Sequence, residues 1–116
     1  MIAQTYDEKQ MSALLSLDGG ALREPLLNDL QRCQTLLDQT LPLDARDSAM
    51  VMRNALHELR GIALTVGATT LARHCAKAEA FCDTGHLAEV LEQRAAIHIA
   101  CEDLRARLKA FTDVAA

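Results

Sequence analysis

The sequence predicts an all-α fold: an up-down antiparallel four-helix bundle with one short additional N-terminal helix. Half of the 116 residues are hydrophobic, yet just three are aromatic, and Ala and Leu dominate. This composition favours helices packed through aliphatic side chains over a β-rich fold. Apolar residues recur three and four positions apart along most of the chain. The connections between these stretches are short, so we expect neighbouring long helices to run antiparallel.

The first two helices are bounded by clear start and stop signals. After a frayed lead-in at 1–6, the first helix covers residues 7–17, with an acidic first turn that suits the helix dipole. Asp18-Gly19-Gly20 stops it. The second helix runs over about residues 21–40, with a proline harmlessly in its first turn, and Leu41-Pro42-Leu43 ends it. Its expected core positions are Leu26, Leu27, Leu30, Cys33, Leu36 and Leu37.

The third helix has two candidate N-caps, Asp44 and Asp47. It ends near Gly67, which is well placed as a left-handed C-cap. Its expected core positions are Met52, Ala55, Leu59, Ala63 and Val66.

The fourth helix opens at Thr69 or Thr70, runs to about Thr84 and is closed by Gly85. A fifth helix covers about residues 87–111. The expected core positions of the fourth helix are Leu71, Cys75, Ala78 and Cys82. Those of the fifth are Val90, Leu91, Ala95, Ile97, Cys101, Leu104, Leu108 and Phe111.

The third helix carries His57 on the side opposite its apolar face. At about 100° per residue, Arg53, Asn54, Arg60 and Gly61 lie within roughly 60° of the histidine. A glycine inside a helix costs about 1 kcal/mol relative to alanine, so its presence indicates that something approaches the helix closely there. The alternative is close packing of another helix, which the polar character of this face disfavours.

Two apolar residues share the exposed side of this helix. At the same 100° per residue, Met50 and Leu64 lie within about 20° of His57 around the helix axis. Exposed apolar residues surrounded by polar ones often mark a partner surface, although scattered apolar residues on a surface are normal. Glu58 follows the histidine directly, and we expect it to be a solvated side chain rather than a base.

The region around His57 resembles a histidine-containing phosphotransfer (HPt) domain. That family has the pattern His-x-Leu-Lys-Gly, a second glycine ten residues after the histidine, and a following helix with a leucine and a closing glutamate. The resemblance covers roughly residues 50–80, and Arg60 replaces the usual lysine, keeping its charge but not its geometry. The matching positions are His57, Leu59, Arg60, Gly61, Gly67, Leu71 and Glu79.

The resemblance implies a phosphoryl carrier without kinase activity of its own. A ring nitrogen of His57 would accept a phosphoryl group from an aspartate of a receiver domain and pass it to another receiver. Arg60 would stabilise the transferring charge, and Gly61 would leave room for it. Partners would be response-regulator receiver domains and a hybrid histidine kinase; this chain would bind no cofactor, and Mg²⁺ would belong to the receiver. The expected binding residues are Met50, Arg53, Asn54, Leu64 and Gly67.

Length and charge exclude several other classes. One domain spanning residues 1–116 is expected, and the chain is too short to hold an ATP-binding kinase module as well. A net charge of −4 argues against general nucleic-acid binding. No apolar run approaches roughly 18 residues, so we expect no membrane span. The N-terminus lacks a basic segment followed by an apolar one, so we expect no secretory signal. We expect a monomeric, cytoplasmic protein, and the initial Met favours a free-standing one.

The four cysteines do not suggest a metal site or a disulfide. Cys33, Cys75, Cys82 and Cys101 have no Cys-x-x-Cys spacing, so we expect reduced thiols packed in the core. A zinc site that uses His74 or other ligands is the alternative, and we expect no bound metal.

Three other functions are compatible with the pattern. A docking module could bind a receiver or a kinase through Met50, Leu64 and the arginines without being phosphorylated. A dimerisation helix pair from a histidine kinase is disfavoured because this chain has enough helices for a monomeric bundle. The last possibility is a purely structural or metal-binding bundle.

Overall fold

The structure, a computed structural model, describes residues 3–39 and 46–111, without the side chains of residues 46–48 and 87. Within these ranges the chain is all-helical, and the one strand-like pairing is an isolated bridge between Tyr6 and Ala68. The helices are α1 (Glu8–Ser16), the short 3₁₀ helix η1 (Leu17–Gly20), α2 (Arg23–Gln39), α3 (Arg46–Val66), α4 (Thr69–Asp83) and α5 (Leu87–Ala110).

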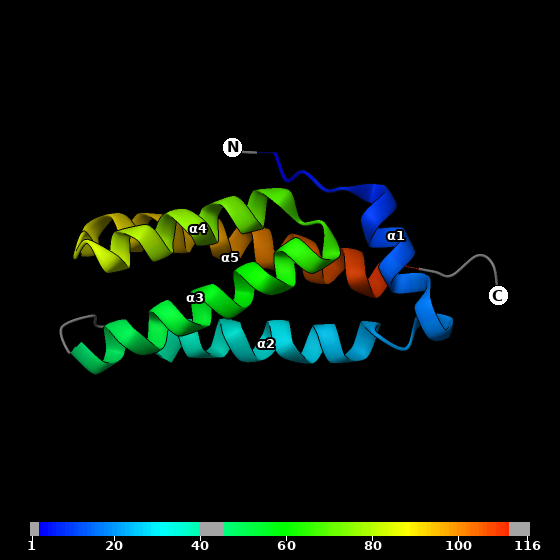
Figure 1. Cartoon of the computed structure of the whole chain (residues 1–116), viewed down its shortest axis with the longest axis horizontal. Helices are drawn as coiled ribbons and strands as arrows, with labels where there is room; N and C mark the ends of the chain where they lie inside the picture. The colour runs from blue at the N-terminus through cyan, green and yellow to red at the C-terminus, as the bar shows by residue number, and fades with distance from the viewer. Residues whose placement is uncertain (1–2, 40–45, 112–116) are drawn as a thin grey trace.

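The four long helices lie side by side along the longest axis of the molecule (Figure 1). Helix α2 packs on α3 and α5, and α4 also packs on α3 and α5. The contacts therefore follow a ring α2–α3–α4–α5, which places the α3–α4 side of the bundle opposite the α2–α5 side. Helix α1, the predicted short additional helix, contacts α3 and lies across one end of the bundle.

The core is built almost entirely from aliphatic side chains. All five core positions predicted for α3 are buried, and Leu56 is buried in addition. In α4, three predicted positions are buried and Cys82 is half-buried. Because Leu and Ala dominate this interior, burial of apolar surface at roughly 25 cal/mol per Å² is the main stabilising contribution.

Helix α5 departs from its predicted apolar stripe. Val90, Ile97 and three later positions are buried, but Leu91 and Ala95 are exposed, so the prediction was wrong for those two. At 100° per residue they lie roughly 120–160° from Ile97. Helix α5 is apolar on two sides, and the sequence pattern alone does not show which side faces the core.

In α2, Leu30, Cys33 and Leu37 are buried, whereas the other three leucines predicted for its core face are half-buried.

The helix ends follow the predicted signals where the structure describes them. The backbone amide of Gln10 donates to Asp7 Oδ1 at 3.0 Å, which caps α1. Asp18 and Gly19 of η1, just after α1, have φ 50° and φ 65° and so interrupt the helical backbone at the predicted stop. Gly67 has φ 79°, as a left-handed C-cap requires. The predicted end of the second helix at 40–43 and the cap at Asp44 lie outside the described residues, as does the side chain of Asp47.

The N-terminal segment is held more firmly than the sequence suggested. Residues 3–6 were expected to fray, but the backbone amide of Thr5 donates to Thr70 Oγ1 at 2.8 Å, and Tyr6 OH donates to Asp103 Oδ2. The guanidinium of Arg107 lies 4.0 Å from the centre of the Tyr6 ring. These contacts join the start of the chain to α4 and α5. Among the described helices, none combines the length and the apolar character that crossing a membrane would need.

Candidate functional site

The side chain of His57 lies on the solvent side of α3 and is directed toward α4. It is 63% exposed, as the sequence predicted. The residues that helical periodicity placed on the opposite side of α3 pack into the core. An exposed imidazole on a rigid helix is accessible to a partner protein and keeps a fixed orientation.

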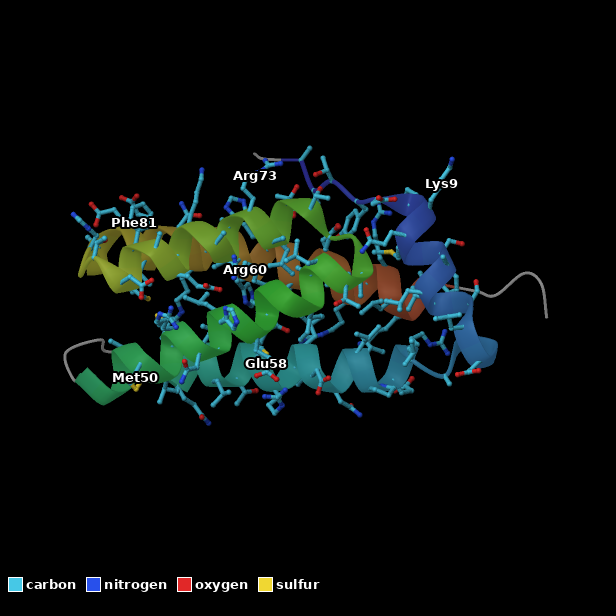
Figure 2. All side chains as sticks on the ribbon, in the orientation of Figure 1. Lys9, Met50, Glu58, Arg60, Arg73 and Phe81 are labelled. Carbon is cyan, nitrogen blue, oxygen red and sulfur yellow. The ribbon has the colours of Figure 1, made fainter. Side chains whose placement is uncertain are left out.

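A buried carboxylate from α4 lies beside the imidazole. Glu79 Oε2 is 3.4 Å from His57 Nδ1, and the Glu79 side chain is only 11% exposed. Arg60, one turn after the histidine, places Nε 3.3 Å from Glu79 Oε1 and Nη2 3.4 Å from His57 Nδ1. Figure 2 shows Arg60 between α3 and α4. Glu79 Oε1 is buried and accepts no well-aligned hydrogen bond. Its contact with Arg60 at 3.3 Å is therefore an ion pair and not a hydrogen bond.

The position of Glu79 decides which ring nitrogen is available. Nδ1 cannot both donate to Glu79 and accept from Arg60, because a ring nitrogen that carries a proton has no lone pair. An ionised carboxylate is an acceptor only, and a buried one requires a donor. We therefore assign the proton to Nδ1. The lone pair then lies on Nε2, the ring atom that does not contact Glu79.

Gly61 is open to solvent, as its predicted role requires. A Cβ built on it meets no atom within 4 Å. None of the described helices packs against it, so the alternative of close helix packing is wrong. The carbonyl of Gly61 accepts a hydrogen bond from Thr65 Oγ1 at 2.8 Å.

Gly67 has a different environment. It is buried, and a Cβ there would lie 2.9 Å from the carbonyl oxygen of Asp7. This glycine ends α3, ten residues after His57, and its lack of a side chain leaves room for the backbone of Asp7.

The other charged residues near His57 are held by ion pairs. Arg53 Nε contacts Asp83 Oδ1 at 2.6 Å, and this hydrogen bond raises the pKa of Arg53. Glu58 is not simply solvated: Arg32 of α2 contacts both of its carboxylate oxygens. The hydrogen bonds from Arg32 lower the pKa of Glu58 below its usual value. Glu58 is therefore turned toward α2 and away from the imidazole.

The two apolar residues predicted to contact a partner lie on the exposed side of α3, as the helical periodicity predicted. Met50 and Leu64 are both exposed, and Val51 adds a third exposed apolar side chain on α3. Asn54 is exposed on the same helix, one turn before His57. The structure thus presents an imidazole surrounded by apolar and ion-paired side chains.

Thiols and metal ligands contribute little to this site. Cys33, Cys75 and Cys101 are buried, and burial raises the pKa of each thiol, to about 11 for Cys33 and about 12 for Cys101. Cys82 is half-buried. Over the described part of the chain, no group of three or more His, Cys, Asp or Glu side chains is placed to hold a metal ion.

One residue of the site had no role in the sequence-based prediction. Glu79 entered only as the last position of the family pattern. The sequence did contain a signal for it. Glu79 lies four residues after Cys75 and three before Cys82, on a helix face whose other residues are apolar. A charge in such a position requires a partner, but the sequence does not show that the partner comes from another helix.

Comparisons with known proteins identify the family of this chain. The model of the Hpt domain family matches residues 21–110. A solved structure described as a histidine-containing phosphotransfer protein from rice shares the fold, with a TM-score of 0.74 and 20% sequence identity over 90% of this chain and 76% of that chain. None of the curated proteins matches the sequence. Because the family model covers most of the chain, this protein belongs to the Hpt domain family.

Proposed function

We propose that this protein is a histidine phosphotransfer protein of a two-component phosphorelay. His57 accepts a phosphoryl group from a receiver-domain aspartate and passes it to the aspartate of another receiver. The observation that carries the proposal is the exposed imidazole of His57, whose Nδ1 faces the buried carboxylate of Glu79 while Nε2 is left available.

The transfer step follows from the proton on Nδ1. The lone pair of Nε2 attacks phosphorus in the acyl phosphate, forming a P–N bond as the P–O bond to the receiver aspartate breaks. The aspartate leaves as a carboxylate. The ring gains positive charge, which the neighbouring carboxylate of Glu79 stabilises through Nδ1–H. The reverse displacement, by the aspartate of a second receiver, breaks the P–N bond and restores the neutral imidazole.

Arg60 and Gly61 support this step in different ways. Arg60 places a guanidinium nitrogen 3.4 Å from the ring, so a small rotation of this half-buried side chain would bring charge-assisted hydrogen bonds to phosphoryl oxygens within reach. Gly61 leaves the space one turn after His57 empty. Arg53 contributes less, because its guanidinium is hydrogen-bonded to Asp83, whereas that of Arg60 already lies beside the imidazole.

The proposal extends to the partners and to the whole chain. Met50 and Leu64 would contact the receiver, with Asn54 at the edge of the same surface. Mg²⁺ would be bound by the acidic pocket of the receiver and not by this chain. A hybrid histidine kinase would supply the upstream receiver. The protein would act in the cytoplasm as one domain, an up-down antiparallel four-helix bundle.

A docking module that is never phosphorylated is the second candidate. The observation in its favour is that both arginines beside His57 are already ion-paired, Arg53 with Asp83 and Arg60 with Glu79. Such a module would use the exposed apolar residues for binding and leave the imidazole without a chemical role.

Phosphoryl transfer from a phosphorylated receiver distinguishes the two candidates. The wild type should gain an acid-labile, alkali-stable phosphate, and His57→Gln should gain none. His86→Gln is the matched control because His86 is also exposed but lies beyond α4; it should transfer like the wild type. Tight binding of a receiver without any phosphate on the wild type would replace the carrier proposal with the docking module.

A further inference from the structure

The solvent side of α5 carries a run of exposed apolar residues, which is unusual for the outer side of a bundle helix. Leu91, Ala95 and Ile99 follow one another at intervals of four residues, and all three are exposed. Ile99 alone is 53% exposed. Residues at this spacing lie on one face of a helix, so these side chains form a continuous stripe.

This stripe borders a groove between α2 and α5. The groove has a volume of about 470 Å³ and is lined by Leu37 of α2 and by the three stripe residues of α5, among others. Because the helices form a ring, the groove lies on the side of the bundle opposite the α3–α4 side that carries His57. A partner in this groove would leave the imidazole free.

The stripe is arranged symmetrically around Ala95. Four residues before it is Leu91, and four after it is Ile99. Three residues before it is Glu92, and three after it is His98. If a two-fold axis passes through Ala95 and two α5 helices cross it in antiparallel directions, each Leu91 meets the other copy's isoleucine. Each carboxylate of Glu92 then meets an imidazole, which can donate a hydrogen bond to it.

Charge around the groove also permits two copies to meet. The chain carries a net charge of −4, which opposes self-association in general. At the groove, however, Asp38 is paired with Arg94 at 3.2 Å, and Glu102 is paired with Arg105 at 3.1 Å. Opposite charges are thus paired within each copy, and the exposed Glu92 beside the stripe meets the imidazole of His98 of the other copy and not a carboxylate.

We propose that a second copy of this chain occupies the groove, in an isologous dimer whose two α5 helices pack antiparallel around Ala95. The small side chain at the axis lets the helices approach closely, and Leu91 and Ile99 of each copy fill the space on either side. A single helix pair buries less than the roughly 1,200 Å² of the smallest stable interfaces, so the expected dissociation constant is about 10 µM to 1 mM. Each bundle still folds alone, because its core is closed by helices of one chain.

Sedimentation velocity across that concentration range tests the association. The wild type should shift from monomer to dimer, and Ile99→Glu should remain a monomer. Leu64→Glu is the matched control, since Leu64 is 59% exposed but lies on the His57 side of the bundle; it should dimerise like the wild type. A wild type that stays monomeric to about 1 mM overturns the proposal and leaves the groove to another protein or a small apolar ligand. Loss of dimer in Leu64→Glu alone also overturns it.

Disulfide trapping tests the position of the axis. In a Cys82→Ser background, Ala95→Cys should form an intermolecular disulfide under mild oxidation, because the two introduced thiols face each other across the axis. Ala106 is equally on the exposed side of α5 but is eleven residues away, which separates the two copies of that residue by about 33 Å. Ala106→Cys should therefore not cross-link in the dimer. Equal trapping at both positions would contradict the proposed register.

Discussion

Replacing Gly61 by alanine separates the stability of the helix from its proposed role in transfer. The glycine lies in the interior of α3, and a Cβ at this position meets no atom within 4 Å. Alanine therefore fits the folded protein without a clash. In a helix interior it is favoured over glycine by about 1 kcal/mol, because glycine loses more backbone entropy on folding.

The expected result combines higher stability with slower transfer. Gly61→Ala should raise the free energy of unfolding by about 0.5–1 kcal/mol, which corresponds to about 2–4 °C in Tm for a domain of this size. Transfer from a phosphorylated receiver should slow, because the new methyl group lies one turn from His57, where the receiver must approach. Gly61→Leu should slow transfer further while the helix remains intact.

The same substitution at the end of the helix serves as the contrast. Gly67 has φ 79°, and an added Cβ would lie 2.9 Å from the carbonyl oxygen of Asp7. Gly67→Ala should therefore destabilise the protein by at least about 1–2 kcal/mol. Chemical denaturation and a transfer assay on both variants give the comparison. If Gly61→Ala is more stable and transfers at the wild-type rate, the glycine is not retained for access, and the reasoning about this surface fails.

Three further predictions rest on particular contacts. Glu79→Ala should lower the ratio of the Nδ1-protonated to the Nε2-protonated tautomer of His57 by up to about tenfold, since a hydrogen bond to a charged group contributes about 1.5 kcal/mol. The ¹⁵N NMR shifts of the ring report this ratio, and an unchanged ratio would show that the carboxylate does not set the tautomer. Tyr6, the single tyrosine, should ionise above its ordinary pKa near 10 because burial and its hydrogen bond to Asp103 raise its pKa. Its contribution to stability should be complete below that ordinary value and lost as the pH rises through the raised one, which phenolate absorbance and denaturation at alkaline pH measure together. In the native protein Cys82 should react first with a thiol reagent, and the three buried thiols should react only on unfolding; rapid reaction of all four would contradict the described core.

The sequence by itself determined the features that depend on local spacing. Helical periodicity placed His57, Met50 and Leu64 on the exposed side of α3, and the structure has all three exposed. The glycine at 67 ended that helix because a left-handed backbone is a local property of a residue without a side chain. The family pattern around the histidine likewise lies within one hairpin of helices, so it could be recognised without a tertiary structure.

The tertiary structure decided which helices are neighbours and how each is rotated. Glu79 is 22 residues from His57, and its contact with Nδ1 exists only because α4 packs beside α3 with this carboxylate facing inward. The pairing of Glu58 with Arg32 depends in the same way on the position of α2. Helix α5 is apolar on two sides, so its own periodicity permits either side to be buried. Packing against α2 and α4 selected one of them and left the stripe around Ala95 exposed, because a helix can turn only one face toward the core.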